Sequence, residues 1–181
     1  MTGPLEEMLS TVDADVVIVS APPDWRLESV QSILVPSRGG LEQSPVRARL
    51  LSNLVRAAKR DVTFLGIRSQ GTPKVNIDRA MRDLRRLARD EAGSRARAEI
   101  ATGDIVEQIV ERTHAADLLL LGLHPSARQH ATFGRVVQEI ADQARCPILM
   151  ISQRISWVRL KRLSGSGRRS GPGRKADRRA V

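Results

Sequence analysis

The stretch from residue 118 to residue 151 constrains the fold of this 181-residue chain more than any other. It runs from four leucines through Gly122, a polar loop and Gly134 into an amphipathic stretch, then through Cys146 and Pro147 into a second apolar run. Short apolar runs bounded by turn residues predict buried strands, and the amphipathic stretch between them predicts a helix. We therefore expect a strand, a loop, a helix and a parallel strand, which form one crossover unit of an open α/β sheet.

The same alternation of strands and helices recurs upstream of this unit. Apolar runs predict five strands in all, at residues 32–36, 62–67, 96–101, 117–121 and 147–151. Apolar residues at helical spacing predict helices that begin after Ser44, at Asp78, after Asp104 and at Gly134. Because most of these runs are apolar on both faces, we expect an α/β fold with a doubly wound parallel sheet that helices cover on both sides.

The N-terminal segment, residues 1–31, precedes the predicted domain at residues 32–153. Within it, LEEMLSTVDADVVIVSAP (5–22) resembles VEQIVERTHAADLLLLGLHP (106–125), since each has a helical stretch, Ala-Asp, an apolar strand and a proline. Two interpretations stand: chance recurrence of a common α/β unit, or the remnant of a preceding, similar repeat. The run at 16–20 is too apolar to stay exposed, so it should join the sheet edge as an extra strand or pair with another subunit.

The net charge of +10 is concentrated in the C-terminal tail, residues 154–181. The tail has ten Lys or Arg and one acid, a balance of +9, whereas the other 153 residues carry 20 basic and 19 acidic side chains. Its Gly, Ser and Arg content predicts disorder from about Ser164 on. Such a tail attracts nucleic acid or anionic lipid, or serves only to keep the chain in solution.

Several classes of function lack support in the sequence. The single cysteine excludes an intrachain disulfide and favours a cytoplasmic location, and no apolar run approaches the roughly 18 residues of a membrane span. His114, His124 and His130 do not have metal-ligand spacing. Since no recognisable motif places a Ser-His-acid set either, we predict neither a metal site nor an enzyme.

Two loops should meet at the candidate ligand site. In a doubly wound sheet, ligands bind at the carboxyl ends of the strands, where the strand order reverses. The loop that follows the first strand contains Ser37, Arg38 and Gly39, and the second loop runs from Gly122 to Gly134. Glycines there let the backbone approach a phosphate, and the following helix directs its N–H groups toward it.

Residues 32–152 resemble the universal stress protein family, whose ATP-binding members have a Gly-x2-Gly-x9-Gly-Ser/Thr loop after the fourth strand. Gly122 and Gly134 fall at the first and last glycines, and the Cys-Pro step before the last strand also matches. The resemblance implies a Rossmann-like sheet of five strands in the order 3-2-1-4-5 and a non-catalytic regulatory role in the stress response. It also implies a ligand site at Pro36, Ser37, Arg38, Gly39, Ile67, Gly122, His124, Arg128, Gly134 and Arg135.

The loop departs from the family pattern at positions that would contact ATP. Pro125 replaces the second glycine, and it has no N–H and a fixed φ. Arg135 replaces the hydroxyl residue, Arg38 replaces an acidic residue that meets the adenosine in the family, and the loop is one residue shorter. We therefore predict a degraded ATP site with no cofactor. The alternative is a competent ATP or AMP site in which Arg38, Arg128 and Arg135 pair with phosphate.

The amino-acid sequences of residues 21–40 and 46–67 resemble those of the stress-protein-like cytoplasmic tails of some bacterial amino-acid permeases. Such tails come as two similar halves, so the resemblance implies a domain derived from a transporter tail, with a membrane transporter or another protein as partner and a location at the membrane. Separately, the apolar strands at 147–152 and 16–20 predict a homodimer by main-chain pairing across a two-fold axis.

Overall fold

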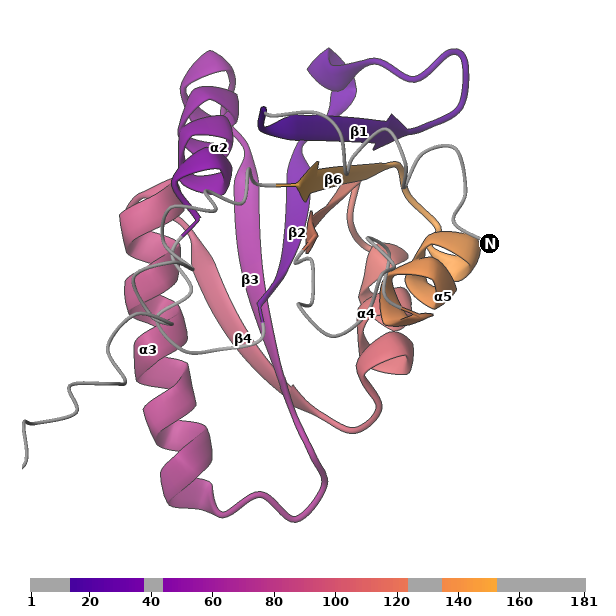
Figure 1. Cartoon of the computed structure of the whole chain (residues 1–181). Coiled ribbons are helices and arrows are strands. Elements are labelled where there is room, and N and C mark those ends of the chain that lie inside the picture. Colours follow the sequence, from indigo (N-terminus) through magenta and orange to yellow (C-terminus); the bar gives the residue numbers. More distant parts are fainter. Residues whose placement is uncertain (1–13, 38–43, 124–134, 153–181) are drawn as a thin grey trace, which may run out of the picture.

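The structure, a computed structural model, describes residues 14–37, 44–123 and 135–152. Its described strands form one sheet in the order β1-β6-β5-β2-β3-β4 (Figure 1). The strands are β1 (Val16–Ser20), β2 (Ser32–Ser37), β3 (Asp61–Arg68), β4 (Arg97–Thr102), β5 (Leu118–Leu123) and β6 (Ile148–Ser152). The five strands from β2 to β6 are parallel and lie in the predicted order, so the predicted fold class is confirmed.

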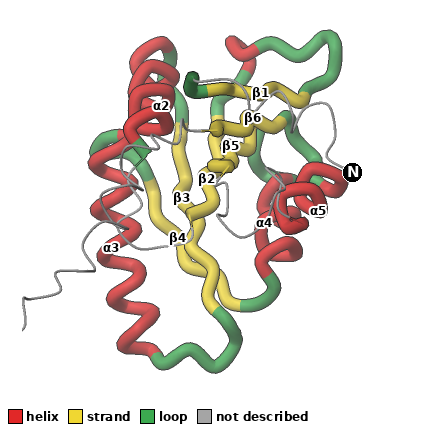
Figure 2. Tube along the Cα trace, viewed as in Figure 1, coloured by secondary structure: helices red, strands yellow, loops and turns green. Residues whose placement is uncertain are grey.

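Helices cover both faces of the sheet. They are the short 3-10 helix η1 (Leu27–Ser29), α2 (Pro45–Ala57), α3 (Lys74–Ala92), α4 (Ile105–Thr113) and α5 (Arg135–Gln143). Figure 2 shows α2 and α3 on one side of the sheet and α4 and α5 on the other. Helix α3 begins at Lys74, directly after Pro73. This start is four residues earlier than the predicted start at Asp78.

Strand β1 is the extra strand predicted from the VVIV run, and it joins the sheet at its edge. It pairs antiparallel with β6 over five residue pairs, from Val16 opposite Ser152 to Ser20 opposite Ile148. The pairing hydrogen-bonds one side of an apolar strand that would otherwise have both edges open. Its other side forms the edge of the described sheet.

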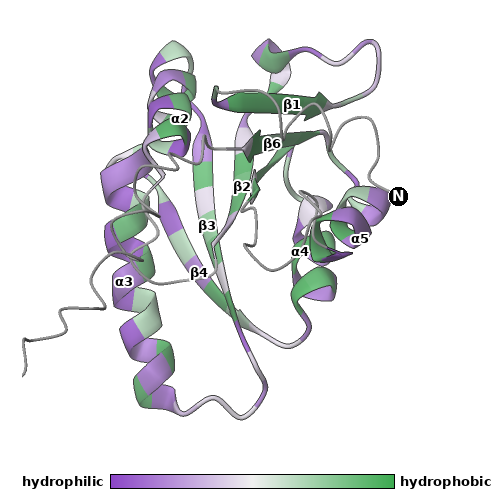
Figure 3. Cartoon of the chain, viewed as in Figure 1, coloured by the Kyte–Doolittle hydropathy of each residue, from purple (hydrophilic) through white to green (hydrophobic). Residues whose placement is uncertain are grey.

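The core divides into two apolar layers, one on each face of the sheet. Along β5, Leu118 and Leu120 belong to the layer under α2 and α3, while Leu119 and Leu121 belong to the layer under α4 and α5. This alternation follows from the two-residue period of a strand. Figure 3 shows the hydrophobic colour on β1, β2 and β6, with mixed colours along the helices. Burying each leucine contributes on the order of 2 kcal/mol.

Ser44 and Asp104, the residues after which two of the predicted helices begin, are the N-caps of α2 and α4. The Ser44 Oγ accepts a hydrogen bond from the Arg47 N–H at 3.1 Å. The Asp104 carboxylate accepts from the backbone N–H groups of Val106 and Glu107 at 2.9 and 3.0 Å. Each cap satisfies N–H groups that a helix leaves without an internal partner, which fixes where α2 and α4 begin.

Two buried arginines connect segments that are distant in the sequence. Arg47 of α2 meets Glu91 of α3 through two hydrogen bonds of 2.6 and 2.8 Å, and both side chains are buried. Arg60 donates to the backbone carbonyls of Val30, Leu54 and Leu27. Arg60 therefore connects the segment before β2 with the end of α2, because the three carbonyls converge on one guanidinium group.

Candidate functional site at the carboxyl edge of the sheet

The candidate site lies where β2 and β5 run side by side. The chain leaves β2 toward α2 on one face and leaves β5 toward α5 on the other, so this is the point where the winding direction reverses (Figure 1). Ligands of open α/β sheets bind at such points. The paired register of β2 with β5 covers only Ile33 with Leu118 and Leu34 with Leu119, whereas β2 pairs with β3 over six positions. The carboxyl halves of β2 and β5 are therefore not paired with each other.

The amino ends of the same two strands are clamped together by Asp117. Its Oδ2 accepts hydrogen bonds from the N–H of Gln31 at 3.0 Å and from the N–H and Oγ of Ser32, both at 2.8 Å. The Asp117 N–H donates in turn to the Ser32 Oγ at 3.0 Å. The bond from the Ser32 hydroxyl, followed by those from the two backbone N–H groups, holds the pKa of Asp117 below its usual value. The strand pair is thus locked at the end opposite the candidate site.

Three of the predicted site residues lie at the carboxyl ends of these two strands. Pro36 and Ser37 end β2, and Gly122 lies one residue before the end of β5. Pro36 stands two residues beyond the last β2–β5 pair, which is where a central strand tolerates a residue without an N–H. Ser37 makes interactions of its own within the protein.

Ile67 lies on the neighbouring strand and serves the core. It stands one residue before the end of β3, opposite Ala101 of β4, and packs against the apolar layer under α4 and α5. A partly buried isoleucine at this height can contribute an apolar contact to a ligand at the edge of the sheet. The structure thus gives Ile67 a packing role.

Arg135 is the first residue of α5, and its side chain turns along the helix. Its Nε donates to the Glu139 Oε1 at 2.6 Å, and the side chain is 90 % exposed. The hydrogen bond and the charge of Glu139 raise the pKa of Arg135 above its ordinary value. Arg135 therefore has a partner of opposite charge one helical turn away, and that partner competes with any anionic ligand. The other predicted site residues, Arg38, Gly39, His124, Arg128 and Gly134, lie outside the described residues.

One residue at this edge escaped the sequence analysis. Arg68 ends β3, beside β2, and its Nη1 donates to the Ile67 carbonyl at 2.9 Å. Its own carbonyl accepts from the Gly103 N–H at 3.0 Å. Arg68 makes further interactions and is therefore not a free cation. A basic residue at the last position of a strand next to the switch point was the signal that could have identified it.

The described part of the chain gives no support for a metal site or for a membrane-spanning helix. Among residues 14–37, 44–123 and 135–152, no group of three or more His, Cys, Asp or Glu side chains could hold a metal ion. No helix in those ranges is both long and apolar enough to cross a membrane.

The fold and the position of the site define a doubly wound α/β domain of the kind that carries a ligand at its switch point. The chain belongs to the universal stress protein family, which matches residues 12–152. A comparison of the sequence with curated proteins finds no match.

Solved structures agree with this fold. A universal stress protein from Archaeoglobus fulgidus shares 16 % identity at a TM-score of 0.52, over 67 % of this chain and 93 % of its own. The universal stress protein of Lactobacillus plantarum shares 17 % at 0.51, over 69 % and 98 %. A universal stress protein in complex with cAMP shares 17 % at 0.50, over 68 % and 98 %. At these identities the likeness establishes the fold alone.

Proposed function

We propose that this chain is a non-catalytic regulatory domain of the stress response whose site at the carboxyl ends of β2 and β5 binds ATP weakly or not at all. The observation that carries the proposal is the first residue of α5. Where ATP-binding members of the family have a small hydroxyl residue, this chain has Arg135, engaged by Glu139 at 2.6 Å. A long side chain that is already paired replaces a short hydrogen-bond donor.

The size of the expected loss follows from the groups that are changed. The loop lacks one glycine N–H at Pro125 and one hydroxyl at position 135, and Arg38 stands where an acid would meet the adenosine. Each lost hydrogen bond in a bound complex costs about 1 to 3 kcal/mol. Three such losses move a micromolar site to the millimolar range or beyond.

A competent nucleotide site is the second candidate, and one observation favours it. The Arg135–Glu139 pair is exposed, and exposed ion pairs are weak, so a phosphate could replace Glu139 as the partner of Arg135. A structurally similar universal stress protein has been solved with cAMP. On this reading the arginines pair with the phosphate of a nucleotide and compensate for the missing hydroxyl.

Titration calorimetry of the full chain with Mg-ATP, AMP and cAMP separates the two candidates. Weak or undetectable heat with all three nucleotides supports the degraded site. A fit to low-micromolar affinity with any of them supports the competent site instead. In that case Arg38→Asp identifies the role of the arginine: affinity falls if Arg38 pairs with phosphate and is little changed if Arg38 only lies at the rim.

We also propose a cytoplasmic location and a protein partner, with a membrane transporter as the candidate that the sequence resemblance implies. The basic tail at residues 154–181 lies outside the described residues, and its attraction to nucleic acid or anionic lipid rests on its charge alone. Fractionation of cells that produce the full chain tests both proposals, because recovery in the soluble fraction supports a cytoplasmic location without a membrane partner, and recovery in the membrane pellet supports attachment to one.

A further inference from the structure

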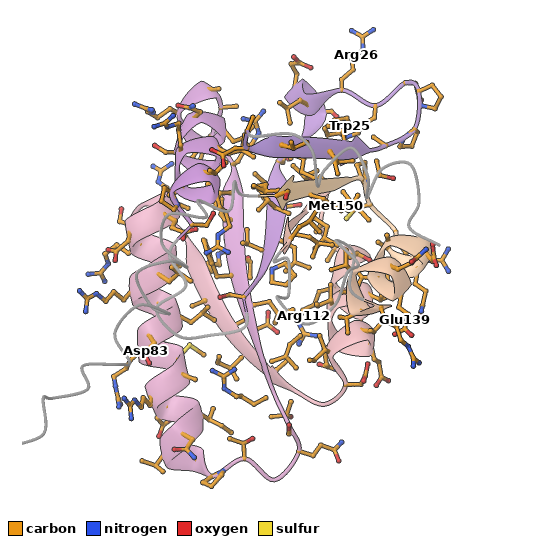
Figure 4. All side chains as sticks on the ribbon, in the orientation of Figure 1. Trp25, Arg26, Asp83, Arg112, Glu139 and Met150 are labelled. Atoms are coloured by element: carbon orange, nitrogen blue, oxygen red, sulfur yellow. The ribbon has the colours of Figure 1, made fainter. Side chains whose placement is uncertain are left out.

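The outward side of α3 carries a row of four arginines. Arg79, Arg82, Arg86 and Arg89 recur at intervals of three and four residues, so they lie along one side of the helix, and all four are exposed. The opposite side of α3 buries Ala80, Leu84, Leu87 and Ala88 in the core. In Figure 4, long nitrogen-tipped side chains project from α3 on the side away from the sheet.

The charge of this surface is only partly neutralised by its own acids. The exposed charged residues of α3 are six basic (Lys74, Arg79, Arg82, Arg85, Arg86, Arg89) and three acidic (Asp78, Asp83, Asp90), which leaves 6 − 3 = +3. Arg86 approaches Asp90 at 3.9 Å, with both side chains well exposed, so the pair is weak. The remaining acid, Glu91, is buried against Arg47 and does not contribute to the surface.

We propose that this arginine row binds the phosphate backbone of double-stranded nucleic acid, without sequence preference. The eleven residues from Arg79 to Arg89 span roughly 15 Å of helix. Over that length one DNA strand carries about four phosphates, as many as the arginines in the row. Apart from Lys74, every exposed basic residue of α3 is an arginine. Guanidinium groups match phosphate oxygens in two-pronged hydrogen bonds better than ammonium groups do.

The composition of the surface favours a duplex over other polyanions. A helix that binds a lipid bilayer inserts an apolar face, but the apolar face of α3 is already buried and Val75 is its one exposed large apolar residue. A single-stranded nucleic acid is held by stacking on aromatic rings, and α3 contains none. A row of arginines without apolar or aromatic neighbours suits a regular backbone of phosphates.

The test compares two variants of the full chain that lose the same charge. The first changes the row, as R79Q/R82Q/R86Q/R89Q. The matched control changes four exposed basic residues elsewhere, as R26Q/R49Q/K59Q/R145Q. Fluorescence anisotropy with a DNA duplex of about 20 base pairs gives the affinity across salt concentrations from about 50 to 200 mM, where phosphate contacts show as a slope. Both variants keep the basic tail, and thermal melting confirms that both are folded.

The row variant should lose at least tenfold in affinity at low salt relative to the control, and its salt slope should fall by at least about two more than that of the control, since each phosphate contact contributes about 0.9. Equal losses in the two variants would overturn the proposal and assign the binding to net charge and the tail. Absence of duplex binding by the unmodified chain would overturn it too. The row variant is also tested for binding to anionic vesicles. If it retains duplex binding but selectively loses vesicle binding, the proposal is overturned as well.

Discussion

Ile18 of β1 pairs with Met150 of β6 at the centre of a register that is symmetric about these two residues. VVIVS at 16–20 matches ILMIS at 148–152 position by position, with Ile18 on Met150 and Ser20 on Ser152. The first residue of each strand lies opposite the last residue of the other. The two strands are therefore related by a local two-fold axis, as two copies of one strand would be in a symmetric dimer. As a result, the outer edge of β6 is occupied, and β1 presents an open edge at this end of the described sheet.

We predict that the chain forms a homodimer in which this open edge of β1 pairs with its two-fold copy. The strand has no charged residue, and its Val17 and Val19 side chains are 43 % and 53 % exposed. Uncharged, apolar edge strands invite pairing with another chain. V17K/V19K should therefore reduce the mass to that of a monomer, measured by light scattering at tens of micromolar, a range set by the roughly micromolar affinity of modest interfaces.

The control for this experiment is V75K/I105K, which changes two other exposed apolar residues and should leave the dimer intact. An unmodified chain that is monomeric at the same concentration contradicts the prediction.

Glu91→Gln should destabilise the protein strongly. The substitution leaves the buried guanidinium of Arg47 without its carboxylate, and breaking a buried ion pair from one side costs about 3 to 5 kcal/mol. Glutamine retains one acceptor, so we expect the lower end of that range in the free energy of urea unfolding. Asp90→Asn, which alters the exposed contact with Arg86 at 3.9 Å, is the matched control and should change stability by less than about 0.5 kcal/mol. Similar effects for the two variants would show that burial of the Arg47–Glu91 pair is unimportant.

The clamp between Asp117 and Ser32 should make stability depend on pH in the acid range. Because hydrogen bonds lower the folded-state pKa of Asp117, its stabilisation is present above its unfolded pKa of about 3.9 and is lost as the pH falls through the folded value. Asp117→Asn should therefore lower the free energy of unfolding at neutral pH by about 1 kcal/mol, a value reduced because the carboxylate is exposed.

The difference between Asp117→Asn and the unmodified chain should shrink as the pH falls below about 4. Ser32→Ala removes the hydroxyl from the same clamp, so its effect should add incompletely to that of Asp117→Asn in a double-mutant cycle. A difference that stays constant from neutral pH to pH 3 would show that the charge of Asp117 is irrelevant.

Local sequence patterns predicted where two of the helices begin. Ser44 and Asp104 were identifiable as caps because each acts on backbone groups two or three residues away. The start of α3 was placed too late because the apolar stripe begins only at Ile77, while the helix begins at Lys74 with Val75 facing solvent. A helix turn without a buried residue gives no periodic signal.

Contacts between distant segments could not be predicted in the same way. The Asp117–Ser32 clamp joins residues 85 positions apart, and the partner of β1 follows from tertiary pairing rather than from its own composition. Within the candidate site, Pro36, Ser37 and Gly122 lie at the carboxyl ends of β2 and β5, and their part in binding a ligand stays a prediction. The i,i+4 pair of Arg135 with Glu139 was readable from spacing alone, whereas its competition with a ligand becomes visible only once α5 is placed.

Cys146 should react slowly with thiol reagents in the folded protein. Burial, with a smaller contribution from the charge of Asp117, raises the pKa of its thiol to about 11. At pH 8 its thiolate fraction is then roughly two orders of magnitude below that of an unfolded cysteine with a pKa of about 8.5. Iodoacetamide alkylation followed by mass spectrometry measures the ratio of folded to unfolded rates. Asp117→Asn should speed the folded reaction, since it removes a negative charge that opposes the thiolate, and an unchanged rate would contradict that electrostatic link.

Restoring the family pattern in the loop should create affinity for ATP, and this prediction tests the proposed function most directly. P125G/R135S returns a backbone N–H and a hydroxyl to the positions that meet phosphate, and it also frees Glu139 from its arginine. Two regained hydrogen bonds of about 1 to 3 kcal/mol each should tighten binding by roughly thirtyfold to twenty-thousandfold, measured by titration calorimetry with Mg-ATP. P125G/R135A is the matched control, since it removes the arginine without supplying the hydroxyl and should gain less. If the unmodified chain binds ATP tightly and P125G/R135S binds it less well, then Arg135 is a phosphate ligand and the competent site is the correct interpretation.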